Sequence, residues 1–355
     1  MSQLLRPLIY DLDLSDLEQS FRETGQPAYR AQQVWQGLYH QFWQQPKQFT
    51  NLPKTLRGWL QENFVFQSLV PSQVLQSKDG ETRKTLFRLP DGRAIEAVLM
   101  RYEQRKTLCI STQAGCAMGC VFCATGQMGF KRHLSSGEIV EQVLYYARML
   151  RDEGEPVTNI VFMGMGEPFH NYDATIQAIN RLNHPAGMNL GARRFTISTV
   201  GLVPAIRRFA GEKSQVNLAI SLHAANDELR SSMLPVNRRY PIAELMAACR
   251  EYIEKTGRRL TFEWALIQDV NDSVESAREL ANLLRGMLCH VNVIPLNPTR
   301  RYSGRGSTRA RATAFKATLE SAGIPCTIRI RRGIDIQAGC GQLATRAEEM
   351  PQGPV

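Results

Sequence analysis

The chain has 355 residues, of which 43% are hydrophobic and 21% are charged, a composition typical of a globular protein with one or two domains. No apolar run is long enough for a signal peptide or a membrane span, so we expect a cytoplasmic protein that does not associate with membranes. Because the cytosol keeps thiols reduced, the eight cysteines are expected to bind metal or act in catalysis rather than form a disulfide framework.

The charge balance favours a polyanionic partner. Lys plus Arg number 43 against 33 Asp plus Glu, a formal net charge of +10. Mild basicity alone has no specific meaning, but three segments concentrate the arginines, and two of them add tyrosine. Such segments neutralise phosphates and stack on bases, which favours nucleic acid. They are Asn237–Tyr240, Asn297–Arg311 and Thr327–Gly333.

Residues 1–68 are expected to form a small helical accessory domain that contacts RNA. Apolar side chains recur at steps of four in segments 29–43 and 49–64, which indicates two short helices around a turn. Residues 69–104 are expected to form a β-hairpin linker, because the alternating segments 82–89 and 94–102 flank an Asp-Gly turn. Glu96 lies in the second of these strands.

From residue 105 to 345 strand and helix patterns alternate, and residues 346–355 form a tail. Ser135 and Glu138 make a capping-box pair at the start of the first helix. About six strand–helix units predict an α/β fold, either a parallel sheet or a partial (β/α)6-type barrel.

Unusual residues follow the ends of the predicted barrel strands. A cysteine-rich loop follows the first strand, and four polar or glycine-rich stretches follow later ones. Parallel barrels build their sites at the carboxyl ends of the strands, so we expect all five to converge on one pocket. The four stretches are Gly164–Pro168, Ser198–Gly201, Ser221–His223 and Leu296–Pro298.

The cysteine-rich loop spaces Cys116, Cys120 and Cys123 as Cys-x3-Cys-x2-Cys, a soft-metal site. A structural zinc ion would need a fourth ligand, which Cys109 or Cys340 could supply. A [4Fe-4S] cluster held by three cysteines instead leaves one iron open for a substrate or cofactor. The position of the loop at the predicted pocket favours the cluster, and zinc is the alternative.

The triplet, with Phe122 between its last two cysteines and "GMGEP" after the next strand, resembles the radical S-adenosylmethionine (SAM) superfamily. The wider set "CISTQAGCAMGCVFC", "MGMGEP", "ISTVG", "ISLHA", "LNP" and "GIDIQAGCGQL" resembles the RlmN/Cfr family of bacterial RNA methyltransferases, from about residue 20 to 345. This resemblance implies a [4Fe-4S] cluster on the triplet and two SAM molecules per turnover. It implies cofactor contacts at Gly166, Glu167, Ser198, Ser221, Leu222, His223 and Asn297.

The resemblance also implies a mechanism. One SAM methylates Cys340, and a deoxyadenosyl radical from a second SAM takes hydrogen from that methyl group. The resulting carbon radical adds to adenine and forms a protein–RNA adduct. Cys109 then attacks the sulfur of Cys340, releases the product and leaves a disulfide to be reduced. Glu96 matches the family's proton acceptor. The target adenine must leave its stack to be reached.

Arg332 and Gly333, just before "IDIQAGCGQL", favour the RlmN type over the Cfr type. The RlmN type methylates carbon 2 of adenine in 23S rRNA at the peptidyl transferase centre and in tRNA 3′ to the anticodon. The alternative Cfr type methylates carbon 8 and confers antibiotic resistance. Gly339 departs from the alanine usual in both types and bears on the geometry of the Cys340 loop.

The expected partners are 23S rRNA, tRNA and a flavodoxin-type electron donor, and we expect a monomer. Arg300, Arg301 and Arg305 are expected to contact RNA. A non-enzymatic, zinc-containing RNA-binding protein is the remaining alternative. It explains the charge and three or four cysteines, but neither the other cysteines nor "GMGEP".

Overall fold

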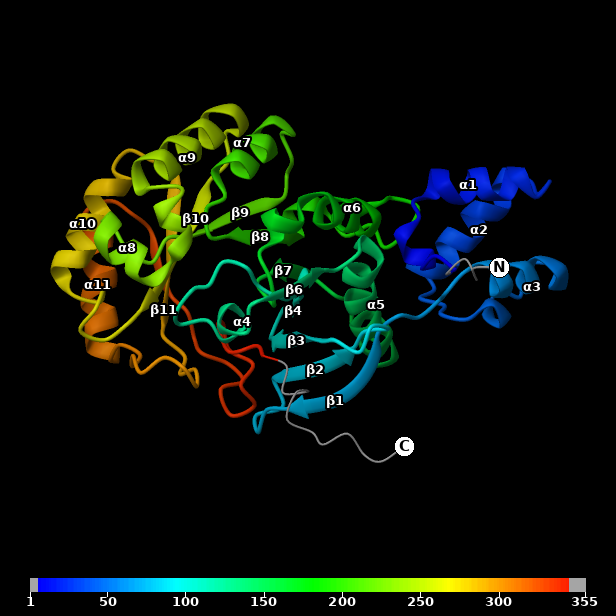
Figure 1. Cartoon of the computed structure of the whole chain (residues 1–355), viewed down its shortest axis with the longest axis horizontal. Helices are drawn as coiled ribbons and strands as arrows, with labels where there is room; N and C mark the ends of the chain where they lie inside the picture. Colours follow the sequence, from blue (N-terminus) through cyan, green and yellow to red (C-terminus); the bar gives the residue numbers. More distant parts are fainter. Residues whose placement is uncertain (1–5, 345–355) are drawn as a thin grey trace.

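The computed structural model describes residues 6–344, so the tail predicted at 346–355 lies outside the described residues. Its main feature is a ten-stranded sheet in the order β1-β2-β3-β4-β7-β8-β9-β10-β11-β12, shown with its covering helices in Figure 1. No helix within residues 6–344 is long and apolar enough to cross a membrane.

Seven neighbouring strands of this sheet run parallel and form the partial barrel. They are β4 (Arg105–Cys109), β7 (Asn159–Phe162), β8 (Phe195–Thr199), β9 (Asn217–Ser221), β10 (Leu260–Leu266), β11 (Cys289–Pro295) and β12 (Cys326–Ile328). The principal connecting helices are α5 (Ser136–Asp152), α6 (Tyr172–Asn183), α7 (Val203–Gly211), α9 (Ile242–Thr256), α10 (Val274–Leu284) and α11 (Arg309–Ser321). The predicted α/β barrel is therefore confirmed.

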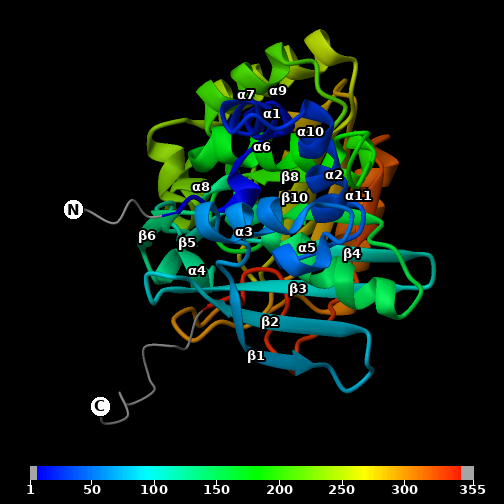
Figure 2. The same cartoon turned by 90° about the vertical axis from the view of Figure 1, so that its right-hand side faces the viewer.

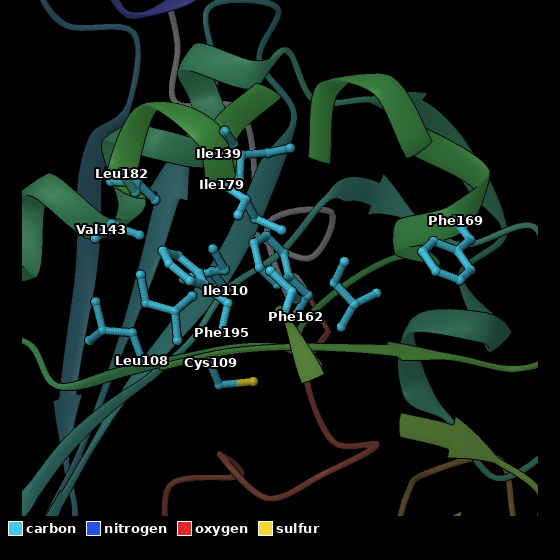
Figure 3. Packing of buried hydrophobic residues seen from close by; sticks show 14 of the residues in the cluster. Leu108, Cys109, Ile110, Ile139, Val143, Phe162, Phe169, Ile179, Leu182 and Phe195 are labelled. Atoms are coloured by element: carbon cyan, nitrogen blue, oxygen red, sulfur yellow. The ribbon is translucent and has the colours of Figure 1, made fainter. Parts of the chain in front are cut away.

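Local sequence signals start and stop these elements. The Ser135 side chain accepts from the Glu138 backbone N–H, and the Glu138 side chain accepts from the Ser135 N–H, so the predicted capping box begins α5. Helix α9 ends at Gly257, which takes a left-handed conformation with φ of 64°. The apolar faces of these helices pack on the sheet, and Figure 3 shows this core around Leu108, Phe162 and Phe195.

The predicted hairpin is present as β2 (Thr82–Arg88) and β3 (Ala94–Tyr102), and β1 (Val70–Gln76) adds a third antiparallel strand. Strand β3 pairs with β4, so the hairpin continues the barrel sheet instead of forming a separate layer. Figure 2 shows β1, β2 and β3 side by side below the barrel strands. This extension provides a wall beside the open side of the barrel.

Three helices form the N-terminal part: α1 (Leu14–Glu23), α2 (Ala28–Tyr39) and α3 (Lys54–Asn63). Helices α2 and α3 match the two predicted helices, whereas α1 was not predicted separately. The part docks on the start of α5, where Asp11 Oδ1 accepts from the Gly137 N–H at 2.6 Å. The Arg181 guanidinium of α6 donates to the Asp11 carbonyl at 2.5 Å.

After β12 the chain turns back across the β1–β3 extension instead of starting another helix. The Lys78 N–H donates to Asp335 Oδ2 at 2.9 Å, and Lys84 Nζ donates to the Gln337 carbonyl at 3.1 Å. The segment then reaches the short helix α4 (Ala124–Gln127), where the Ala124 N–H donates to the Gly341 carbonyl at 2.8 Å. Cys340 thereby comes to line the same cavity as Cys120 and Cys123 of the cysteine-rich loop. Figure 1 shows this segment, in red, near α4.

Candidate active site

One cavity lies at the carboxyl ends of the parallel strands, where the sequence predicted a pocket. It brings together residues from the cysteine-rich loop, five barrel strands and the C-terminal segment. Nine of the thirteen predicted site residues line it: Cys120, Cys123, Gly166, Glu167, Ser198, Ser221, His223, Asn297 and Cys340. Cys116, Cys109, Glu96 and Leu222 lie outside its wall and are described below.

The cysteine-rich loop is held by backbone contacts. The Cys116 N–H donates to the Gly129 carbonyl at 3.1 Å. Gly115 is required just before it, because a Cβ there would lie 1.9 Å from the same carbonyl oxygen. Burial raises the pKa of the Cys116 thiol to about 12 and that of Cys120 well above its usual range. In both cases the neighbouring Cys123 sulfur raises the pKa further, so the three sulfurs lie close together.

The donor set of this loop fits an iron–sulfur cluster. No three histidine, cysteine or acidic side chains within residues 6–344 converge as ligands of a single metal ion. In a cubane cluster each thiolate binds a different iron, so the sulfurs need not meet at one point as they would around zinc. Three thiols on one loop at a cavity mouth suit a cluster whose fourth iron faces the cavity.

The strand end after β7 forms one wall of the cavity. Gly166 has φ of 106°, and a Cβ there would lie 2.6 Å from Gln113 Cβ. The Glu167 carboxylate is buried and accepts from the Phe169 and Val200 N–H groups, each at 2.9 Å. Burial raises the pKa of Glu167 to about 7, although these hydrogen bonds act to lower it. Glu167 therefore ties the ends of β7 and β8 together at the cavity.

The ends of β8 and β9 form the next wall. Ser198 and Ser221 face each other with their hydroxyl oxygens 3.5 Å apart. His223 Nδ1 accepts from the Ala265 N–H at 2.9 Å, and burial lowers the pKa of His223 to about 3. The imidazole is therefore neutral. Leu222 differs from its neighbours, because its side chain is buried in the main hydrophobic core rather than in the cavity wall.

Asn297 supplies an unsatisfied acceptor. Its Nδ2 donates to the Cys340 carbonyl at 3.1 Å, but its buried Oδ1 has no hydrogen-bond partner within residues 6–344. A buried amide oxygen without a partner is costly, and a ligand N–H or O–H in the cavity would satisfy it. With the Glu167 carboxylate and the Ser198 and Ser221 hydroxyls, this wall fits a cofactor that carries amino, carboxylate and ribose groups.

Gly339 is accommodated by close packing. Its N–H donates to Gln342 Oε1 at 3.1 Å, and a Cβ would lie 2.6 Å from Asn297 Nδ2. The departure from alanine therefore allows the Cys340 loop to approach Asn297 closely.

Cys109 and Cys340 are both free thiols; Cys340 lines the cavity, and Cys109, at the end of β4, lies outside its wall. Figure 3 shows the Cys109 sulfur turned away from Leu108 and Ile110, out of the core and toward the side where the C-terminal segment runs. Burial raises the pKa of Cys109 to about 12, and the Cys340 sulfur adds to the rise. Cys340 is exposed toward the cavity, yet the surrounding walls still raise its pKa, while Arg329 opposes the shift.

Glu96 is buried on β3 and shares a face of the sheet with Cys109, because Val98, two residues along, pairs with Cys109. Lys84 Nζ lies 3.0 Å from Oε1, and the Ala344 N–H donates to Oε2 at 3.0 Å. The Glu96 side chain therefore points inward, although it is outside the cavity wall.

Three residues that the sequence did not single out support this site. Gln113 Oε1 accepts from the Glu167 N–H at 2.8 Å. Lys84 is the ion-pair partner of Glu96, and the hairpin register could have suggested it because Lys84 pairs with Val98. Arg329 lies near both Cys109 and Cys340 and follows the last strand directly. Its role depends on a chain reversal that no local signal predicts.

A barrel with a three-cysteine loop at the carboxyl ends of its strands is the arrangement of a radical SAM enzyme. The family model described as "Radical SAM superfamily" matches residues 110–282, and "Ribosomal RNA large subunit methyltransferase N-terminal domain" matches residues 9–66. A radical SAM methyltransferase from Sphaerobacter thermophilus superposes with a TM-score of 0.93 at 54% identity, covering 96% of this chain and 99% of that one.

Two curated relatives extend the match. The probable dual-specificity RNA methyltransferase RlmN of Chloroflexus aurantiacus is 52% identical over 95% of this chain and 93% of its own. The dual-specificity RNA methyltransferase RlmN 1 of Myxococcus xanthus is 49% identical over 96% and 95%. The chain belongs to the RlmN family of radical SAM methyltransferases.

Proposed function

We propose that this enzyme methylates carbon 2 of adenine in 23S rRNA, at the peptidyl transferase centre, and in tRNA, 3′ to the anticodon. The observation that carries the proposal is that the C-terminal segment returns Cys340, a thiol outside the triplet, to the cavity wall, near enough to Cys109 to raise the pKa of that second thiol. Carbon 2 of adenine is electron-poor, so a polar methyl transfer cannot reach it and radical chemistry is needed. The names and full-length coverage of the relatives support the RlmN type over the Cfr type.

In this proposal Cys116, Cys120 and Cys123 hold a [4Fe-4S] cluster. Gly166, Glu167, Ser198, Ser221, His223, Asn297 and the backbone of Leu222 hold SAM, of which two are used per turnover. Together the two groups supply one-electron reduction and hydrogen abstraction. Glu167 and Ser198 would bind the amino and carboxylate groups of SAM, and the unsatisfied Asn297 Oδ1 would accept a hydrogen bond from its ribose or adenine.

Cys340 carries the methyl group that is passed to adenine and becomes joined to the base through a methylene. Cys109 then attacks the sulfur of Cys340. The S–S bond forms as the S–C bond to the methylene breaks, and the released carbon takes up a proton to become the methyl group. The Glu96 carboxylate accepts the proton lost from the ring carbon. Because Lys84 and Ala344 both contact this carboxylate, the C-terminal segment must shift for it to act.

We further propose a cytoplasmic monomer that receives electrons from a flavodoxin-type donor. The proposed division is an N-terminal RNA-contacting domain at 1–68, a hairpin extension at 69–104 and a catalytic core at 105–345. Mass spectrometry of nucleosides from a deletion strain, with and without the gene restored, tests the activity. Return of 2-methyladenosine in both rRNA and tRNA is expected. Appearance of 8-methyladenosine would favour the Cfr type, and absence of both would remove the substrate assignment.

A further inference from the structure

A second cavity opens at the opposite, amino-terminal end of the barrel. Its volume is about 550 Å³, within the range of about 300–1,000 Å³ for ligand pockets. Barrel interiors are ordinarily filled by bulky branched side chains. Here six neighbouring parallel strands each contribute a polar side chain instead: Thr107, Asn159, Thr196, Asn217, Thr261 and Asn292.

Four arginines line the same cavity, and we call them the arginine cluster: Arg105, Arg193, Arg258 and Arg259. None pairs with a carboxylate in the described part of the chain. The guanidinium groups of Arg193 and Arg258 both donate to the amide oxygen of Gln215, and the buried Nε of Arg258 has no partner within residues 6–344. Unpaired cations around one opening repel each other, and a polyanion would relieve this repulsion.

This second cavity joins the first, whose wall includes Cys340. Met163 and Glu263 line both cavities, so the two meet inside the barrel. Arg329 lines the second cavity and lowers the pKa of both Cys109 and Cys340, so it lies close to both sulfurs. In the proposed function the first cavity is filled by the cofactor. The second cavity, which joins the first at Met163 and Glu263, is then the space left for a nucleotide.

The segment that follows Arg329 exposes an isolated apolar side chain. Ile330 is 82% exposed, whereas the next most exposed large hydrophobic residue within 6–344, Val70, is 55% exposed. Ile330 lies in a surface depression with Tyr102 and with charged side chains of both signs, among them Arg332 and Glu81. Arg332 lies over the Tyr102 ring at 4.5 Å, and Arg105 of the arginine cluster lies over the same ring at 4.9 Å. An exposed aliphatic side chain amid charged ones suits neither core packing nor a solvated surface.

We propose that the target nucleotide enters through this amino-terminal mouth, that the arginine cluster binds the phosphates flanking it, and that Ile330 fills its place in the base stack. The inference rests on the proposed function and names how the RNA is held. Extrusion of a base costs unstacking energy, and apolar wedges between base steps offset that cost in proteins that deform nucleic acids.

The phosphate contacts are tested by RNA binding to the full chain without cofactor. Fluorescence anisotropy with a labelled tRNA anticodon stem–loop, titrated at several salt concentrations, gives the Kd and its salt slope. Arg105→Gln combined with Arg259→Gln should weaken binding and reduce the slope by about 2, since each phosphate contact contributes about 1. The side chains of these two make no hydrogen bond within residues 6–344, so folding should be unaffected. Arg278→Gln, on the outer helix α10, is the control and should change neither value. An unchanged slope in the double variant would overturn the phosphate assignment.

The wedge is tested with the same RNA carrying 2-aminopurine at the target position, whose fluorescence rises when the base leaves its stack. We expect Ile330→Ala to lose most of this rise while the salt slope stays that of the wild type. Val70→Ala, a matched exposed aliphatic change on β1, should retain it. If Ile330→Ala shows the same rise in 2-aminopurine fluorescence as the wild type, Ile330 does not act as the wedge. If the wild type methylates RNA but all these variants bind RNA and extrude the base normally, only this inference is wrong. If the wild type methylates neither rRNA nor tRNA, the proposed function is wrong.

Discussion

Lys84 and Glu96 form a buried ion pair, with 3.0 Å between Nζ and Oε1, across strands β2 and β3. The Lys84 ammonium also donates to the Gln337 carbonyl, and the other Glu96 oxygen accepts from the Ala344 N–H. The two ends of the segment that carries Cys340 are therefore fastened to one ion pair. This ion pair therefore connects the proposed proton acceptor, Glu96, to the segment that carries the proposed methyl carrier, Cys340.

Glu96→Gln should abolish methyl transfer and lower the stability of the protein. The substitution leaves the Lys84 charge buried without a counterion, and breaking a buried pair in this way costs about 3 kcal/mol or more. Thermal unfolding and an RNA methylation assay measure the two effects separately.

The double variant Lys84→Met with Glu96→Gln separates positioning from proton transfer. Removing both charges should recover most of the stability, because no buried charge is left unpaired. If Glu96 accepts the proton, methyl transfer stays absent. If the double variant methylates RNA at a rate close to the wild type, Glu96 acts only by holding the Cys340 segment.

Cys109→Ala should trap the enzyme on its substrate. Without this thiol nothing attacks the sulfur of Cys340, so the RNA stays joined to the protein and migrates with it on a denaturing gel. Cys249→Ala is the matched control, since Cys249 is also a buried thiol but lies in α9, away from the cavity. Multiple turnovers by Cys109→Ala would contradict the role given to Cys109.

Gly166→Ala should prevent SAM binding. Its φ of 106° is unfavourable for any residue with a Cβ, which costs about 1–3 kcal/mol, and the new carbon would lie 2.6 Å from Gln113 Cβ. Isothermal titration of SAM into the cluster-loaded variant checks the loss. In contrast, Gly211→Ala at the end of α7 meets no atom within 4 Å and should bind SAM normally. Normal affinity in Gly166→Ala would show that this strand end does not contact SAM.

Glu141 should make the stability of the protein fall as the pH rises. Burial raises its pKa from 4.5 to about 7, although Ser68 and Leu69 donate hydrogen bonds to the carboxylate. The folded state therefore holds a proton that the unfolded state releases, and the resulting stability is lost between about pH 4.5 and pH 7. Relative to Glu141→Gln, the wild type should lose about 3 kcal/mol across this range. If the melting temperatures of the wild type and Glu141→Gln change with pH in the same way, the pKa of Glu141 is not raised.

Features set by local sequence were predictable. The hairpin of β2 and β3 follows from alternation around an Asp-Gly turn, and the start of α5 follows from the Ser135–Glu138 capping box. Helix α1 was missed as a separate element, although the Asp13 and Asp16 capping box that begins it is a local signal. The pocket was predictable as well, because parallel strands bring their carboxyl ends to one edge regardless of packing detail.

Residue orientation was less predictable. Leu222 stands between Ser221 and His223, which both line the cavity, and adjacency in the sequence placed all three in one group. Strand β9 ends at Ser221, and the chain turns at His223, which has φ of 62°, so the Leu222 side chain is buried in the core while both neighbours line the cavity. The ion pair of Lys84 with Glu96 also required the register of two strands and the closing C-terminal segment.

The sequence by itself determined the chemical groups and the order of the strands that carry them: three closely spaced thiols, two distant ones, and polar residues at strand ends. Only the tertiary structure decided that Cys340 returns to the cavity beside Cys109, that Arg329 lines the second cavity, and that Ile330 stays exposed. The reason is that the segment after β12 reverses direction and is held by contacts to β2, β3 and α4. Such long-range contacts depend on the assembled sheet and leave no periodic signal in the residues that make them.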